Sequence, residues 1–212
     1  QGFWGMLHNT PAQVKIPLLI REGWYDHRLG SALQPDHALR EEIRRKRLLQ
    51  IGPWNHIYRA VIPQEKSEHA LERDVVGIVD WFRAVLMRGE TPKVEVQEYV
   101  IGADRWITRS SRAESGKSRV FYADADSRTL DDIPPETDSK VSYLYDPENP
   151  VPSHGAESLL RDLQENGSLV QPGPNWRSDV ISFVSAPLDA DFTCDGVIRA
   201  RLFVSSDAQD TA

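Results

Sequence analysis

Residues 15–30, with the sequence KIPLLIREGWYDHRLG, decide the fold of this chain. The run at residues 15–20 is short and almost continuously apolar, which is the pattern of a strand buried in a parallel sheet. Asp26 lies a few residues beyond the end of that run. In open α/β sheets the functional groups gather beyond the carboxyl ends of the strands, so Asp26 is a candidate site residue.

A second unit of the same kind follows. Residues 47–51 (RLLQI) predict another buried strand, and His56 lies just beyond it. Between the two strands, residues 35–45 (PDHALREEIRR) predict a helix, because they contain strong helix formers and run from acidic to basic along the helix dipole. The order is therefore strand, Asp, helix, strand, His, and both side chains are expected at one edge of the sheet.

The order of Asp26 and His56 suggests a hydrolase triad. An α/β-hydrolase carries a nucleophilic serine on a G-x-S-x-G turn, followed along the chain by Asp or Glu and then by His. The sequence has the second and third members in this order and contains no G-x-S-x-G. We therefore expect the C-terminal part of a hydrolase whose nucleophile precedes Gln1.

Seven segments, in order along the chain, resemble landmarks of one known family. They are GWYD (23–26), GPWNH (52–56), WFRAVL with RGETP (81–92), VIGADRW (100–106), YDPENPVP (145–152), RSDVISF (177–183) and GVIRARLFVSSDAQDT (196–211). Together they are similar to the Xaa-Pro dipeptidyl-peptidase and cocaine esterase family of serine hydrolases. The resemblance implies an α/β-hydrolase domain with an inserted helical cap and a following β jelly roll. It also implies that Asp26 and His56 are the triad acid and base.

The expected fold class is α/β followed by all-β. Residues 1–13 are expected to end the helical cap, and residues 14–92 to form the C-terminal part of the α/β-hydrolase catalytic domain. That part closes with a predicted helix over residues 67–87, which has an apolar stripe and includes Trp81 and Phe82 as expected core residues. Residues 93–212 alternate short strands with turn residues, and are expected to form a partial C-terminal jelly-roll β-sandwich.

Composition excludes several kinds of partner. The net charge of −7 and the pI near 5.4 argue against a nucleic-acid-binding surface. No run approaches the roughly 18 apolar residues of a membrane span, so no membrane partner is expected. The single cysteine, Cys194, rules out an internal disulfide and is expected to be a buried, inert thiol. A cytoplasmic location is expected, while secretion and a homo-oligomer stay open.

The expected chemistry is acyl transfer to serine. A neutral imidazole at His56 would accept the serine proton, and an ionised Asp26 would orient the ring and stabilise the imidazolium. The partner would be a small-molecule ester or peptide substrate, and this mechanism needs no cofactor. His27 suggests a metal site with His37 or His56, but no Asp or Glu spacing completes one, so no metal is expected.

Three aromatic residues flank the catalytic positions. Trp24, Tyr25 and Trp54 are expected either to wall the acyl pocket or to pack at the strand ends. Since the sequence begins without Met and lacks the nucleophile, we expect this chain alone to be inactive. The alternative function is a non-catalytic fragment or pseudoenzyme that acts as a β-sandwich binding or interaction module.

Overall fold

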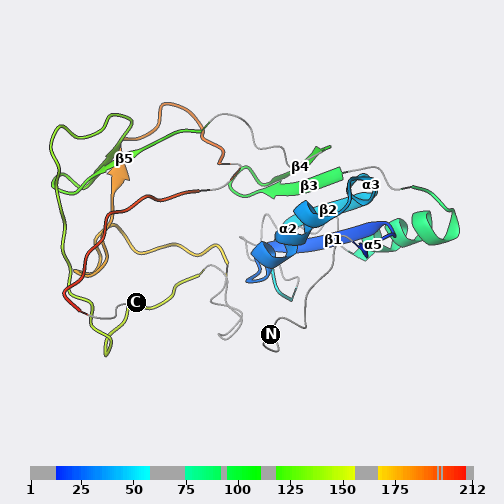
Figure 1. Ribbon diagram of the computed structural model, residues 1–212, viewed down its shortest axis with the longest axis horizontal. Helices are drawn as coiled ribbons and strands as arrows, with labels where there is room; N and C mark the ends of the chain where they lie inside the picture. The colour runs from blue at the N-terminus through cyan, green and yellow to red at the C-terminus, as the bar shows by residue number, and fades with distance from the viewer. Residues whose placement is uncertain are drawn as a thin grey trace. The chain divides into compact units, whose positions relative to one another are not determined.

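The structure is a computed structural model that describes residues 13–57, 75–91, 95–110, 118–155, 167–194, 196 and 198–208. The chain divides into two units. Unit 1 comprises Gln1–Arg112 and His154–Val170, and unit 2 comprises Ala113–Ser153 and Gln171–Ala212. The described residues are rich in sheet with few helices (Figure 1). Both units hold a mixed sheet. Apart from Gln13, the expected end of a helical cap lies outside the described residues.

Unit 1 is built on a four-stranded sheet. Its strands, in spatial order, are β1 (Leu18–Tyr25), β2 (Arg47–Asn55), β3 (Glu95–Val100) and β4 (Arg105–Arg109). β1 and β3 both run parallel to β2, whereas β4 is antiparallel to β3. β2 is buried along nearly all of its length, as a central parallel strand should be. The hydrophobic core consists of Leu49, Ile51 and Val96, with Ile20, Trp24, Leu29 and Leu33 packed against it.

Two helices connect β1 to β2, where the sequence predicted one. α2 (Leu29–Ala38) begins earlier than expected and α3 (Glu41–Arg44) follows it, with Arg40 extended between them. The early start has a local cause, because the Leu29 amide donates to the Asp26 carbonyl at 2.9 Å and so turns the chain directly into α2. α2 lies against β1 (Figure 1). The two strands are therefore joined by a helical crossover, as parallel strands require.

The long helix predicted over residues 67–87 is described from residue 75 onward. It consists of α5 (Val75–Phe82) and a π-helical continuation, η3 (Arg83–Met87). The helix ends at Met87 with Arg88 as its C-cap, and Gly89, which has a positive φ of 62°, follows the cap. Phe82 is 47% exposed and meets Trp81 edge to face, so the expectation that Phe82 is a core residue is wrong here. A π turn contains more residues than an α turn, so the stripe predicted from an α-helical period does not continue through η3.

The sheet of unit 1 continues past the expected domain boundary at residues 92–93. β3 pairs with β2 from Leu48↔Glu95 to Ile51↔Glu98, and β4 then extends the same sheet as far as Arg109. The alternating pattern that begins at residue 93 predicted a strand here correctly but could not say which sheet the strand joins. The strand that we assigned to the jelly roll therefore lies beside the strand that precedes His56.

Unit 2 contains a smaller mixed sheet, compatible with part of a β-domain. β5 (Tyr122–Asp124) and β6 (Thr129–Asp131) form an antiparallel pair, and β7 (Val184–Ser185) is parallel to β6. The alternating pattern of residues 93–212 predicted short strands, but the described residues 198–204 form none, and Phe203 is 94% exposed. Cys194 is exposed rather than buried, because the segment around it forms no strand that could cover it. In the described part of the chain, no helix has the length and apolar character to cross a membrane.

Arg177 joins two of the family-like segments within unit 2. Its guanidinium donates to both carboxylate oxygens of Asp179, at 2.7 and 2.6 Å, and to the carbonyl of Asn149 at 2.7 Å. Such a two-pronged pair fixes the guanidinium plane. The segments at residues 145–152 and 177–183 are thus connected by a structural contact.

Candidate active site

Asp26 and His56 each lie one residue beyond a strand, at the same edge of the sheet of unit 1. β1 ends at Tyr25 and β2 ends at Asn55, and these two residues are register partners. Because the strands are parallel, the next residue of each strand lies at their shared carboxyl end. The sheet therefore brings Asp26 and His56 together, as the order of the residues predicted.

A β-bulge sets this alignment. The register runs from Leu18↔Arg47 to Gly23↔Gly52, and then shifts by one residue to Tyr25↔Asn55. Two residues of β2, Pro53 and Trp54, therefore lie opposite one residue of β1. Without the shift Asp26 would be level with Asn55. Because successive side chains alternate between faces, His56 would then project from the other face.

Two glycines make room for the bulge. A Cβ on Gly23 would overlap with the carbonyl group of Trp54, and a Cβ on Gly52 would overlap with the Trp54 ring. Glycine in a strand often marks such a close approach. The Trp54 side chain is 1% exposed and packs near Trp106, with ring centroids 5.8 Å apart. The landmarks GWYD and GPWNH thus share a local structural role, since their glycines admit the tryptophan that precedes His56.

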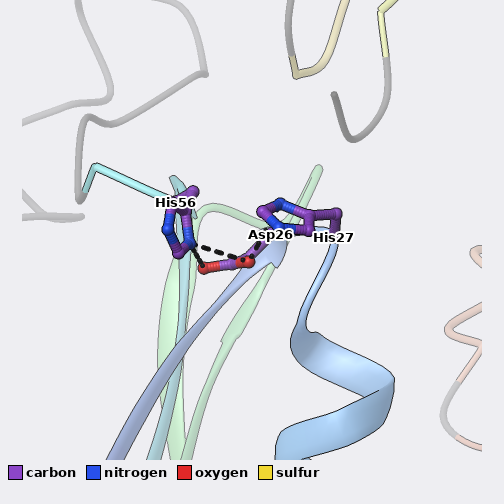
Figure 2. A group of neighbouring side chains, drawn as sticks. All are labelled: Asp26, His27 and His56. Carbon is purple, nitrogen blue, oxygen red and sulfur yellow. Dashed lines mark hydrogen bonds and ion pairs between the residues drawn. The ribbon is translucent and has the colours of Figure 1, made fainter. Parts of the chain in front are cut away.

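The two side chains are hydrogen-bonded. Nδ1 of His56 lies 3.0 Å from Oδ2 and 3.2 Å from Oδ1 of Asp26 (Figure 2). An ionised carboxylate only accepts, so it favours the tautomer in which Nδ1 carries the hydrogen. Nε2 of His56 then holds the lone pair. Such an imidazole can accept a proton from a nucleophile.

The surroundings of Asp26 keep its carboxyl group ionised. Asp26 is 5% exposed, and burial acts to raise its pKa. The hydrogen bond from the Arg28 amide to Oδ1, at 2.8 Å, and the interactions with His56 and His27 outweigh burial. The pKa of Asp26 therefore lies below its ordinary value. An ionised, fixed carboxylate is what a histidine-orienting acid requires.

Glu22 is a neighbour that the sequence did not identify as part of the site. Burial raises the pKa of Glu22 above its ordinary value, and the negative charge of Asp26 and a hydrogen bond to it act in the same direction. Strand alternation does not reveal this contact, because Asp26 lies beyond the end of β1 and residues four apart in an extended strand are about 13 Å apart. Glu22 thus adds a second carboxyl group beside the candidate acid.

His27 lies beside the same carboxylate. Its Nδ1 is 3.6 Å from Asp26 Oδ1, and its ring centroid is 4.8 Å from that of His56. One ligand atom from each of Asp26, His27 and His56 can be chosen so that all lie within 4.8 Å of one another. We call these three residues the Asp-His-His cluster. Sequence spacing did not predict this cluster, because its members come from the ends of two different strands. The other histidine considered as a partner of His27, His37, has a side chain outside the described residues.

The three flanking aromatics occupy different environments. Trp24 packs on the core and donates from Nε1 to the Tyr99 carbonyl at 2.7 Å. Trp54 is a buried residue of the bulge itself, whereas Tyr25 is half-buried at the end of β1. The placement of Trp24 and Trp54 favours packing. A substrate contact by any of the three stays a prediction.

The chain is similar to a known esterase. No family model matches it. It is 30% identical over 217 residues to cocaine esterase from Rhodococcus sp. (strain MB1 Bresler), and the match covers 93% of this chain. The chain spans 37% of the length of that relative. This similarity supports a family-level relationship to esterases, and hence to hydrolases.

Proposed function

From this relationship we propose that the chain provides the acid and base of a serine hydrolase. The substrates would be acyl esters, or peptides and amides of the kind cleaved by Xaa-Pro dipeptidyl-peptidases. The observation that carries the proposal is the 3.0 Å contact between His56 Nδ1 and Asp26 Oδ2 at the carboxyl ends of two parallel strands. That is the position and orientation that the last two members of a hydrolase triad occupy.

The fold assignment is part of the same proposal. Parallel β1, β2 and β3, with a helical crossover between the first two, would be the C-terminal portion of an α/β-hydrolase sheet. Unit 2 would belong to a jelly-roll domain. The support is the order of seven family-like segments along the chain and the sheet-rich character of the described residues.

The proposed mechanism assigns one role to each side chain. His56 accepts the serine proton at Nε2 as the hydroxyl attacks the substrate carbonyl, and later donates it to the leaving group. Asp26 holds Nδ1–H and stabilises the imidazolium during both transfers. His56 then activates a water molecule, which hydrolyses the acyl-enzyme. The low pKa of Asp26 suits this role, because a protonated carboxyl could not accept the hydrogen bond from Nδ1.

We propose that the serine lies on a segment preceding Gln1. In α/β-hydrolases the nucleophile comes before the acid and the base, and the printed sequence contains no G-x-S-x-G. The chain also matches 37% of the length of its relative, so a longer protein is consistent with the similarity.

The test uses the longest open reading frame that contains this chain. A fluorophosphonate probe should label it at serine, and short acyl p-nitrophenyl esters should be hydrolysed. His56→Ala should abolish labelling and turnover, while His154→Ala should not, because His154 is exposed and bonds the Val170 carbonyl outside the site. Absence of labelling in the unsubstituted protein would contradict the proposal and favour a β-sandwich binding module.

A further inference from the structure

The Asp-His-His cluster offers three donors to a point between two strand ends. Asp26 and His27 follow β1, and His56 follows β2 (Figure 2). Oδ1 of Asp26 lies 3.2 Å from Nδ1 of His56 and 3.6 Å from Nδ1 of His27. Ligands around a tetrahedral Zn²⁺ lie about 3.3 Å apart, since each bond is about 2.0–2.1 Å long. The two measured separations lie on either side of that value.

The donor types also suit a transition-metal ion. Imidazole nitrogen and carboxylate oxygen are ligands that Zn²⁺ and its neighbours in the first row accept, and three protein ligands leave one position for water. Asp26 supplies the negative charge, and its Oδ1 is held by the Arg28 amide at 2.8 Å. A ligating carboxylate is commonly oriented by such a bond. The carboxylate of Asp26 is therefore held in one orientation.

His27 is the member without a role in the triad. Its Nδ1 is buried and makes no hydrogen bond within the part of the chain that the structure describes, although it lies 3.6 Å from the carboxylate. The side chain is 28% exposed, so its ring can rotate toward an ion. A buried nitrogen without a hydrogen-bond partner is costly, and a coordinate bond would satisfy it.

We propose that Asp26, His27 and His56 bind one divalent transition-metal ion, such as Zn²⁺, in place of the hydrogen bond between His56 and Asp26. A coordinate bond forms at Nδ1 of His56, and the hydrogen leaves Nδ1 while Nε2 takes up a proton from water, so the ring stays neutral. Nε2 can then no longer accept a proton. Metal binding itself is independent of the proposed function, whereas its consequence, reversible inhibition of the hydrolase, rests on that function.

The binding test uses the 212-residue chain and zinc chloride. Isothermal titration calorimetry should give one site per chain. His27→Gln should weaken the affinity by at least about tenfold, as losing a ligand or its support commonly does. His154→Gln is the matched control, because it removes a histidine outside the cluster. Circular dichroism checks that each variant is folded.

A residue-resolved measurement keeps the proposal testable if a variant misfolds. In the unsubstituted chain labelled with ¹⁵N-histidine, Zn²⁺ should shift the ring nitrogens of His27 and His56 and leave those of His154 unchanged. Three results would overturn the site: no binding by the unsubstituted chain, equal affinity in His27→Gln, or equal weakening in His154→Gln. Shifts confined to other histidines would do the same.

Inhibition is tested separately in the longer reading frame. Zn²⁺ should slow fluorophosphonate labelling, a chelator should restore it, and His27→Gln should raise the zinc concentration needed for half-inhibition by about tenfold. If the longer protein is not labelled at all, the proposed hydrolase fails while the calorimetric site stands. If it is labelled and zinc has no effect, the inhibitory consequence is refuted.

Discussion

Gly23 lies so close to the backbone carbonyl of Trp54 that no side chain could be accommodated there. The contact crosses from β1 to β2 at the point where the register shifts. It shows why the tetrapeptide that ends at Asp26 begins with glycine. The packing of two strands, rather than a reacting group, sets that requirement.

Replacing Gly23 with alanine should therefore destabilise the chain. The added methyl group meets backbone atoms, which cannot move aside as a flexible side chain can, and overpacking of this kind costs about 1–3 kcal/mol. Urea unfolding followed by circular dichroism measures the difference. Gly30→Ala is the control, since its Cβ would meet nothing within 4 Å and alanine favours α2. Equal stability of Gly23→Ala and the unsubstituted chain would contradict the close approach.

In the longer reading frame, Asp26→Asn should lower kcat by about 10⁴ without removing the protein's ability to fold. An amide can donate to Nδ1 and so favours the wrong tautomer of His56, which leaves a weak residual rate. Steady-state hydrolysis of a p-nitrophenyl ester measures this rate. Asp80→Asn, on the exposed side of α5, should leave kcat unchanged. Full activity in Asp26→Asn would remove Asp26 from the mechanism.

Glu22→Gln should stabilise the chain at pH 7. A carboxyl group whose pKa is raised on folding binds its proton more tightly in the folded state, so stability falls as pH rises from the unfolded pKa through the folded pKa. Glutamine avoids this loss and keeps a donor toward Asp26. The advantage should disappear at about pH 3, below the ordinary glutamate pKa of about 4.3.

Thermal unfolding at pH 3 and pH 7 measures the effect of Glu22→Gln. Glu42→Gln is the matched control, because that side chain is 61% exposed and should change stability by less than about 0.5 kcal/mol. A lower Tm for Glu22→Gln at pH 7 would show that Glu22 is ionised and supported by positive charge instead.

Trp24→Phe should cost about 1–2 kcal/mol. The substitution keeps an aromatic ring against the core but removes the 2.7 Å hydrogen bond to the Tyr99 carbonyl. Chemical unfolding measures the cost, and Trp176→Phe on the 44% exposed Trp176 should be nearly neutral. If Trp24→Phe kept full stability yet raised KM in the longer protein, a substrate contact would replace the packing role.

Local patterns predicted part of this structure well. The apolar runs before Asp26 and His56 are adjacent parallel strands, and the order of those two residues predicted their shared edge. The extended pattern at residues 95–100 also forms a strand, but in the first sheet rather than in the second. Alternation is a property of one strand, whereas its sheet depends on contacts with residues far along the chain.

The finer features of the site could not be predicted without knowing how β1 and β2 pair in three dimensions. The shift between Gly23 and Tyr25 depends on how the two strands pair, and a glycine in either strand signals a close approach without giving the register. The proximity of His27 to His56 likewise follows from two strand ends meeting. The contact of Glu22 with Asp26 also depends on how the chain turns at the end of β1, where the Asp26 amide donates to the Gly23 carbonyl.

The bulge decides on which face of the sheet His56 lies, because side chains alternate between the two faces along a strand. One extra residue in β2 gives His56 the same facing as Asp26, so deleting either Pro53 or Trp54 would change an even relationship into an odd one. No adjustment of side-chain rotamers could restore the contact, because the whole ring would leave on the opposite side of the pleat. A one-residue deletion within 52–55 should therefore separate His56 from Asp26 whichever residue is removed.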